Sequence, residues 1–90
     1  MREAESDHFI LLLHKNGDRV KKIGVTIRKK VGGAVFRNRM RRLIKEFFRL
    51  HKELFKECHD HLIKVKKMPE KATWNIVREE LRILLGGNAV

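Results

Sequence analysis

The chain of 90 residues has a single cysteine, a single proline and no long apolar run. One cysteine, Cys58, excludes an internal disulfide and fits a reducing compartment, so we expect a cytoplasmic protein. The longest apolar run, FILLL at residues 9–13, is far too short to cross a bilayer or to serve as the apolar part of a signal peptide. We therefore expect a protein in solution.

Acidic residues are also scarce: 11 Asp and Glu stand against 22 Lys and Arg, a formal net charge of +11. Such a charge indicates a polyanionic partner, either nucleic acid or an anionic membrane surface. The acids are scattered, so they predict neither a metal-dependent nuclease site nor a placed general base. With 42% hydrophobic residues, the chain is predicted to be one folded domain over residues 1–90. Its polar first six residues, MREAES, are expected to be disordered.

Three segments have the pattern of a strand. Residues 8–14 (HFILLLH) form a short apolar run that predicts a buried strand, and residues 20–28 (VKKIGVTIR) alternate between apolar and polar residues. Asn16 and Gly17 stand between them and are typical of tight hairpin turns, so we expect these two strands to form an antiparallel hairpin. Residues 61–67 (HLIKVKK) alternate again and predict a third strand.

Two segments have helical periodicity. From Ala34 to about residue 57, apolar residues recur at spacings of three and four, which predicts one long amphipathic helix. A second helix is predicted to begin after Thr73, a typical N-cap residue, and to end at Gly86. The order strand, strand, helix, strand, helix predicts an α+β fold: a small α/β sandwich of three or more strands with helices packed on the sheet.

The segment RKKVGGAVFRNRMRRLIKEFFR, residues 28–49, concentrates the charge: nine Lys and Arg and one acid, Glu46, give it a net +8. A solvated helix face usually mixes both signs, because acid–base pairs at spacing four stabilise it. Here Arg37 and Arg39 lie in the first turn, where the helix dipole disfavours cations, and Asn38 has low helix propensity. A bound polyanion accounts for all three features, since phosphates neutralise the arginines and accept from free backbone amides.

These residues closely resemble the RNR signature of the bacterial ribonuclease P protein component. The signature combines a basic pair, a glycine, Ala-Val, Arg-Asn-Arg, a second basic pair and an ending of an aromatic residue and arginine. In this chain the corresponding positions are Lys29, Lys30, Gly32, Ala34, Val35, Arg37, Asn38, Arg39, Arg41, Arg42, Phe48 and Arg49. A weaker resemblance extends over about residues 7–86.

The resemblance implies a small subunit that joins a catalytic RNA and assists removal of the 5′ leader from precursor tRNA. The RNA, with magnesium, carries the chemistry, so we expect no catalytic residue, metal ligand or cofactor in the chain itself. The expected partners are the catalytic RNA and precursor tRNA. Together with the charge pattern, the resemblance assigns the RNA contacts to Lys29, Lys30, Arg37, Asn38, Arg39, Arg41, Arg42, Lys45 and Arg49.

The resemblance also implies a fold like domain 2 of ribosomal protein S5. In that fold a left-handed crossover runs from the second predicted strand through the basic helix to the third, although βαβ units are generally right-handed. Members of the family begin with a further helix, which MREAES is too short and too acidic to replace. We therefore expect an exposed apolar patch where that helix would pack, and a possible homodimer through it.

In the family, a cleft between the N-terminal helix, the sheet and the RNR helix accepts the single-stranded leader. We expect Phe9, Thr26 and Arg28 to line what remains of this cleft, because stacking and basic contacts hold single strands. The alternative for Phe9 is a place in the protein core.

Three other functions stay open from the sequence. A divergent RNA-binding protein, such as a ribosome-associated factor, would use the same helix on another structured RNA. A basic amphipathic helix also binds anionic membranes, although the strands here supply a partner for its apolar face. Cys58, His59, Asp60 and His61, with His51 nearby, suggest a metal site, but their spacing matches no standard zinc pattern.

Overall fold

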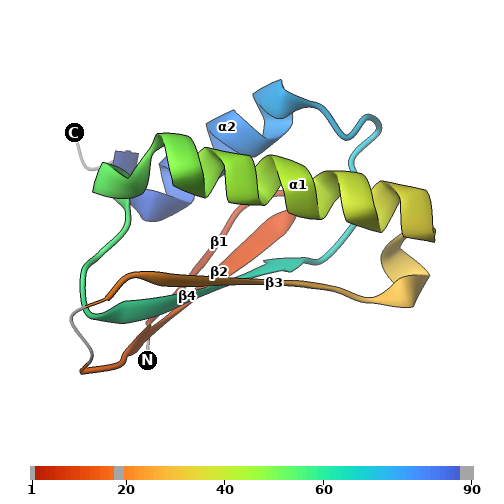
Figure 1. Ribbon diagram of the computed structural model, residues 1–90. Helices are drawn as coiled ribbons and strands as arrows, with labels where there is room; N and C mark the ends of the chain where they lie inside the picture. Colours follow the sequence, from red (N-terminus) through yellow and green to blue (C-terminus); the bar gives the residue numbers. More distant parts are fainter. Residues whose placement is uncertain (1, 18–19, 88–90) are drawn as a thin grey trace.

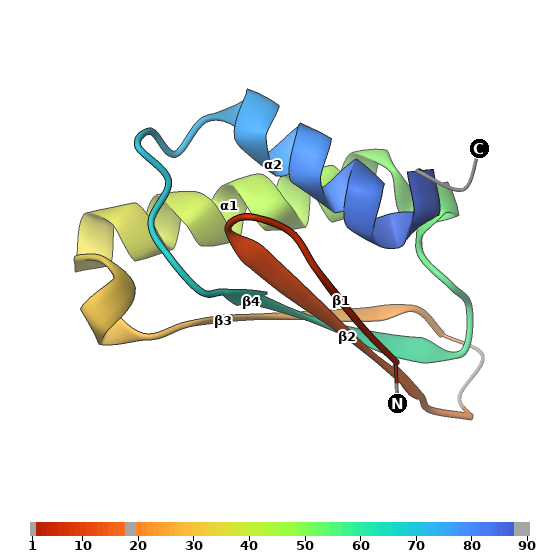
Figure 2. The ribbon, with the colours of Figure 1, turned by 180° about the vertical axis from the view of Figure 1, so that it is seen from behind.

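The computed structural model describes residues 2–17 and 20–87. One four-stranded sheet carries both helices on the same face, and Figure 2 shows β1 and β2 from behind, beneath α2 (Figures 1 and 2). The strands are β1 (Arg2–Glu5), β2 (Phe9–Lys15), β3 (Lys22–Ile27) and β4 (His59–Val65), and the helices are α1 (Ala34–Leu50) and α2 (Trp74–Arg82). The predicted α+β sandwich is confirmed. In the described residues neither helix is both long and apolar enough to cross a membrane.

The strand order is β1-β2-β4-β3, with β2 antiparallel to β1 and β4, and β3 parallel to β4. The predicted hairpin between β2 and β3 is therefore wrong, because β4 lies between them. Asn16, just after β2, bonds both β4 and the start of the next segment: its backbone N–H donates to Cys58 O (2.8 Å), and its Nδ2 donates to Asp60 Oδ1 (2.9 Å) and to Val20 O (3.0 Å). The end of β2 is thus joined to β4. The alternating β3 occupies the edge, where polar outward residues protect a strand from further pairing.

β3, α1 and β4 form a βαβ unit whose two parallel strands are neighbours. When the unit is viewed from the helix side with the strands pointing upward, β4 lies to the left of β3 (Figure 1). The crossover is therefore left-handed, the uncommon hand that the family resemblance implied.

The first residues form a strand, so the expected disorder of residues 1–6 is wrong for residues 2–5; Met1 lies outside the described residues. β1 pairs with β2 along its whole length. The turn after β1 is held by Glu80 of α2, which accepts from Ser6 Oγ (2.5 Å) and from the backbone N–H of His8 (2.9 Å). Burial alone would raise the pKa of Glu80, but the hydrogen bonds from Ser6 and His8 outweigh it and lower that pKa.

The core lies between the inner face of the sheet and the two helices, and β2, β3, β4, α1 and α2 all bury residues in it. Its members are Phe9, Leu11, Ile27, Met40, Ile44, Phe47, Phe55, Ile63, Val65, Val77, Leu81 and Leu84. Phe9 is 0% exposed, so its predicted place in an open cleft is wrong, and the core alternative is correct. The reason is the two-residue period of a strand, which puts Phe9 on the same face as Leu11.

α1 ends at Leu50 rather than near residue 57. His51 leaves the helical conformation (φ −130°, ψ 44°), and a 3₁₀ turn at Lys52–Leu54 follows. Phe55 still reaches the core, whereas Leu50 is 47% exposed. The periodicity misled because a 3₁₀ turn also returns apolar residues at a spacing of three.

α2 begins after Thr73 as predicted, but the Thr73 side chain makes no capping hydrogen bond. The chain continues beyond α2 in a wider helical turn, Ile83–Gly87. Gly86 then adopts the left-handed conformation (φ 99°) that commonly ends a helix, so the predicted stop at this glycine is confirmed.

Candidate RNA interface

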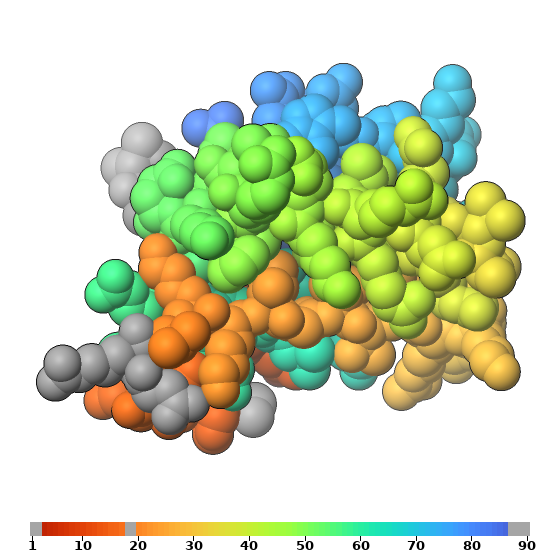
Figure 3. Space-filling model, viewed as in Figure 1, coloured from red at the N-terminus to blue at the C-terminus, as the bar shows by residue number. Residues whose placement is uncertain are grey.

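The polar side of α1 and the turn before it form the candidate site. After β3 the chain makes a 3₁₀ turn at Lys29–Val31 and enters α1 through two glycines. Seven residues of this surface are exposed, while Arg37 and Arg41 are half-buried. Figure 3 shows that side chains of α1 extend along the length of this face of the molecule. We call this set the basic surface: Lys29, Lys30, Arg37, Asn38, Arg39, Arg41, Arg42, Lys45 and Arg49.

Five cations of the basic surface have no hydrogen bond or ion pair to any part of the chain that the structure describes. They are Lys29, Lys30, Arg41, Arg42 and Lys45. A helix face that only meets water usually pairs such groups with acids one turn away. The charge therefore stays available for an external anion.

Two arginines of the signature bond uncharged backbone carbonyls. Arg37 Nη1 donates to Gly32 O (2.9 Å), and Arg39 Nε donates to Ala72 O (2.7 Å) just before α2. Because a carbonyl carries no net charge, both arginines remain cationic toward a phosphate. Arg39 has a second role in the fold, since its bond ties α1 to the start of α2.

Among the residues that the structure describes, Arg49 is the member of the basic surface that pairs with a carboxylate. Its Nη2 lies 2.5 Å from Glu46 Oε2, at a spacing of three residues on the helix. This hydrogen bond, together with charge attraction, lowers the pKa of Glu46 and raises the pKa of Arg49. The net charge of the pair is zero, so Arg49 contributes less to the positive potential than the arginines near the start of α1.

The two glycines before α1 have different surroundings. A Cβ on Gly32 would lie 2.4 Å from Phe36 Cδ2 and 2.7 Å from Met68 Cε, so only glycine fits there without movement. A Cβ on Gly33 would meet nothing within 4 Å. Gly33 is the N-cap and has no side chain to bond the first amides of α1, which leaves them open to an anion.

The sheet face opposite the helices is a second candidate surface, which we call the outer face. Strand register sets its outward residues in rows that run from β1 to β3. The first row is Glu5, Ile10, Lys64 and Thr26, and the second row is Glu3, Leu12, Leu62 and Gly24. The first row is mainly polar and charged, and the second is mainly apolar.

Each row opens into a hollow. The hollow at the first row has a volume of about 230 Å³ and is also lined by Arg28, Lys30 and Lys66. The hollow at the second row has a volume of about 440 Å³ and is lined chiefly by Leu12, Leu62 and the residues around them. A basic hollow and an apolar hollow therefore lie side by side on the outer face.

The predicted cleft residues are only partly brought together. Thr26 and Arg28 line the basic hollow, whereas Phe9 faces the core. Ile10 takes the place predicted for Phe9, and Lys64 joins from β4. The sequence contained the signal for Ile10, because a strand that buries Phe9 must turn its next residue outward.

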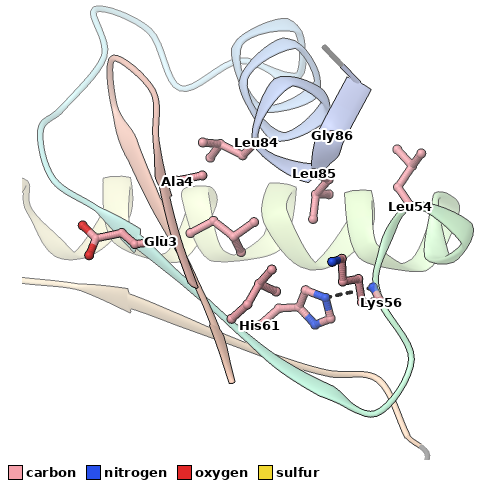
Figure 4. A pocket seen from close by; sticks show the side chains of 10 residues that line it. Glu3, Ala4, Leu54, Lys56, His61, Leu84, Leu85 and Gly86 are labelled. Atoms are coloured by element: carbon pink, nitrogen blue, oxygen red, sulfur yellow. Dashed lines mark hydrogen bonds between the residues drawn. The ribbon is translucent and has the colours of Figure 1, made fainter. Parts of the chain in front are cut away.

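A third hollow, of about 240 Å³, lies between β1, β2 and the end of α2 and is lined mainly by leucines (Figure 4). Its polar base is the buried His61, whose Nε2 accepts from the backbone N–H of Lys56 (3.0 Å) and whose Nδ1 lies 3.1 Å from Lys22 O. Burial lowers the pKa of His61, so the neutral ring connects three segments. Both ring nitrogens of His61 are therefore engaged within the fold.

The metal alternative receives no support from the described residues, among which no group of three or more His, Cys, Asp and Glu is placed to hold a metal ion. His61 is committed to backbone partners, and His59 Nδ1 lies 2.8 Å from Glu57 O. Although residues 58–61 are neighbours in the sequence, their side chains do not converge on one point as metal ligands would.

A family model described as Ribonuclease P matches residues 1–87. The ribonuclease P protein component of Syntrophus aciditrophicus is 41% identical over 84 residues, which cover 93% of this chain and 71% of the relative. The one from Geotalea uraniireducens is 42% identical over 78 residues, 87% of this chain and 68% of the relative. These matches favour ribonuclease P over the alternative of another RNA-binding protein.

Solved structures show the same fold at low sequence identity. The RNase P protein of Staphylococcus aureus aligns with a TM-score of 0.83 at 23% identity, over 99% of this chain and 82% of that one. The RNase P protein of Thermotoga maritima aligns with a TM-score of 0.79 at 23% identity, over 93% of this chain and 81% of that one. The individual RNA contacts stay predictions. Family match, relatives and fold agree: the chain belongs to the ribonuclease P protein component family, the protein subunits of the ribonucleoprotein enzyme that processes tRNA 5′ leaders.

Proposed function

We propose that the basic surface binds phosphates of the catalytic RNA, and that the outer face binds the single-stranded 5′ leader of precursor tRNA. The observation that carries the first part is the set of five exposed or half-buried cations without an acidic partner among the described residues. Such charges repel one another in the isolated chain. A bound phosphate chain relieves that repulsion, and arginine's planar fork suits phosphate oxygens.

The outer face supports the second part. Lys64, Arg28 and Thr26 surround the exposed side of Ile10 in the basic hollow. Grooves that hold single strands combine cations for the backbone with side chains against which bases pack. Lys30 belongs both to this hollow and to the basic surface, so the two RNA-binding areas are contiguous. A leader on the outer face would thus run toward the catalytic RNA.

The chain contributes binding and positioning in this proposal. Magnesium, which we expect for the RNA subunit, prefers oxygen ligands from carboxylates and phosphates. The basic surface offers cations instead, so the ligands of magnesium are proposed to come from the RNA. We place the complex in the cytoplasm, in agreement with the single cysteine of the sequence.

The test of the basic surface compares two double variants with the same change of charge. Arg41→Gln with Arg42→Gln removes cations of the basic surface, and Arg78→Gln with Arg82→Gln removes exposed cations of α2. Filter binding of the catalytic RNA is measured at several salt concentrations. We expect the first variant to bind more weakly, with a log–log salt slope shallower by about 0.7–0.9 for each lost phosphate contact. Equal slopes in the two variants would contradict the proposal.

The test of the outer face uses Lys64→Gln in the enzyme reconstituted at low magnesium. Affinity for precursor tRNA should fall, while affinity for mature tRNA, which has no leader, should stay unchanged. Lys15→Gln, an exposed lysine of β2 outside the hollow, is the control. If the chain fails to stimulate leader removal at all, its assignment as a functional subunit is wrong.

We also propose that the apolar part of the outer face pairs two copies of the chain when RNA is absent. Leu12 and Leu62 are both half-buried there, and Gly24 beside them adds no side chain. Because this surface adjoins the one proposed for the leader, RNA and self-association should compete. Sedimentation velocity with and without a leader oligonucleotide measures this, and a monomer at high protein concentration without RNA would exclude the dimer.

A further inference from the structure

The outer face carries opposite charges at its two edges. β1, at one edge, places Glu3 and Glu5 in the two rows of outward residues. Figure 4 shows the carboxylate of Glu3 pointing away from the leucine-lined cavity. At the other edge, Arg28 and Lys30 follow β3 and lead to the basic surface. The potential therefore becomes more positive from β1 toward α1.

Glu5 reaches the basic hollow through an ion pair with Lys66, the residue after β4. The backbone N–H of Lys66 donates to His8 O (2.9 Å), which fixes the point from which its side chain extends. The side chain of Lys66 is 29% exposed and that of Glu5 is 53% exposed, so both remain within reach of a ligand. Within the described residues, Lys64 and Arg28 in the same hollow make no ion pair.

We propose that Glu5 is a specificity-determining residue that withholds Lys66 from RNA and directs a single strand toward Lys64 and Arg28. A phosphate at Lys66 must displace the carboxylate or lie beside it, and both lower the affinity. A phosphate at Lys64 meets an unpaired cation. Glu3, in the next row, continues the repulsion along β1. The strand is thereby held over the outer side of β4 and β3, near Lys30 in the turn before α1. This inference rests on the proposed binding of the leader to the outer face.

The same ion pair has a purely structural reading, as a tie between β1 and the end of β4. Exposed ion pairs stabilise a fold only slightly, however. β1 is already held by its backbone pairing with β2 and by the bonds of Glu80 to Ser6 and His8. Removing the charge of Glu5 should therefore leave the unfolding transition in urea unchanged, so that a change in RNA binding reports on the interface.

The experiment replaces Glu5 by glutamine, which keeps the shape of the side chain and removes its charge. Glu79→Gln is the matched control, because Glu79 is an exposed acid on α2. The probes are a single-stranded leader oligoribonucleotide and precursor tRNA in the reconstituted enzyme, each titrated at several salt concentrations. Glu5→Gln should bind both about three- to tenfold more tightly at low salt, with a slope steeper by about 0.7, the value for one more contact to a single strand. Glu79→Gln should behave like the wild type.

Lys66→Gln supplies the second measurement. If Glu5 acts through Lys66, the gain from Glu5→Gln largely disappears in the Lys66→Gln background. A gain of full size in that background overturns the inference, and so does an equal gain in Glu79→Gln. A wild type that binds precursor no better than mature tRNA overturns leader binding and this inference with it. Leader-dependent binding that Glu5→Gln leaves unchanged overturns only the role of Glu5.

Discussion

Replacement of Gly32 by alanine tests whether close packing shapes the entry into α1. The added Cβ would lie 2.4 Å from Phe36 Cδ2 and 2.7 Å from Met68 Cε. Met68 is 49% exposed and can move its methyl group away, but the ring of Phe36 packs against the core. The backbone at Gly32 is extended (φ −174°, ψ 166°), so the conformation itself suits any residue and the cost is steric. Overpacking of this kind predicts a loss of about 2 kcal/mol in the free energy of unfolding.

Gly33→Ala is the matched control one residue later. Its Cβ would meet nothing within 4 Å, and the backbone (φ −70°, ψ 174°) accepts alanine. Alanine is a poorer N-cap than glycine but restricts the unfolded chain more, so the two effects oppose each other and the expected change stays within about 0.5 kcal/mol. Urea denaturation of the wild type and both variants, with m-values compared, measures the difference. Equal stability of the two variants would refute the steric argument.

The same variant separates positioning from direct contact with RNA. Displacing Phe36 shifts the first turn of α1, and Gly32 O is the acceptor for Arg37. Gly32→Ala should therefore weaken binding of the catalytic RNA while all cations remain, so the salt slope should stay near that of the wild type. A slope as shallow as that of Arg41→Gln with Arg42→Gln would show that phosphate contacts had been lost instead.

Three further predictions concern stability. Burial lowers the pKa of His61 below its ordinary 6.5, so the unfolded chain takes up this proton first as the pH falls. The wild type should therefore lose stability as the pH falls below 6.5 toward the lower folded-state pKa, and urea titrations should find this dependence reduced in His61→Gln. The pKa of Glu80 lies below its ordinary 4.5, so the stability from its carboxylate is present above that value and lost as pH falls through the lower folded-state pKa; Glu80→Gln should lack this acid-side loss. Thr73→Ala should cost less than about 0.5 kcal/mol because Thr73 makes no capping bond, and a loss of 1 kcal/mol or more would contradict that geometry.

The helices and three of the strands could be predicted because they depend on local spacing of apolar residues. β1 could not, since it is polar and its Ala4 packs only partly against the core. It forms because β2 offers a free backbone edge, a reason that lies outside its own sequence. The predicted hairpin between β2 and β3 was wrong for a similar reason. Asn16 and Gly17 favour a turn, but the local sequence does not show that Asn16 bonds Cys58 and Asp60, which lie more than 40 residues later in the chain.

The basic surface was predictable because its residues belong to one helix and the turn before it. The contacts that modify it are of two kinds. The pair of Arg49 with Glu46 spans three residues and could have been foreseen from helical spacing. The bond from Arg39 to Ala72 could not, because it depends on where the start of α2 comes to lie. The outer face was found only in part, since its rows combine residues from four strands whose order the sequence left undetermined.

The parallel pairing of β3 and β4 is what joins the two proposed RNA-binding surfaces. Register sets Thr26 beside Lys64 and Ile27 beside Val65, so both strands end at the same edge of the sheet. Arg28, which follows β3, and Lys64, near the end of β4, therefore line the same hollow as Lys30, in the turn before α1. An antiparallel β4 would have carried its lysines to the far edge. The topology thus concentrates positive charge in one place, where it opposes folding of the isolated chain, and the proposed RNA contacts would relieve that repulsion. In this proposal, binding to RNA is the reason that a chain this small keeps a net charge of +11.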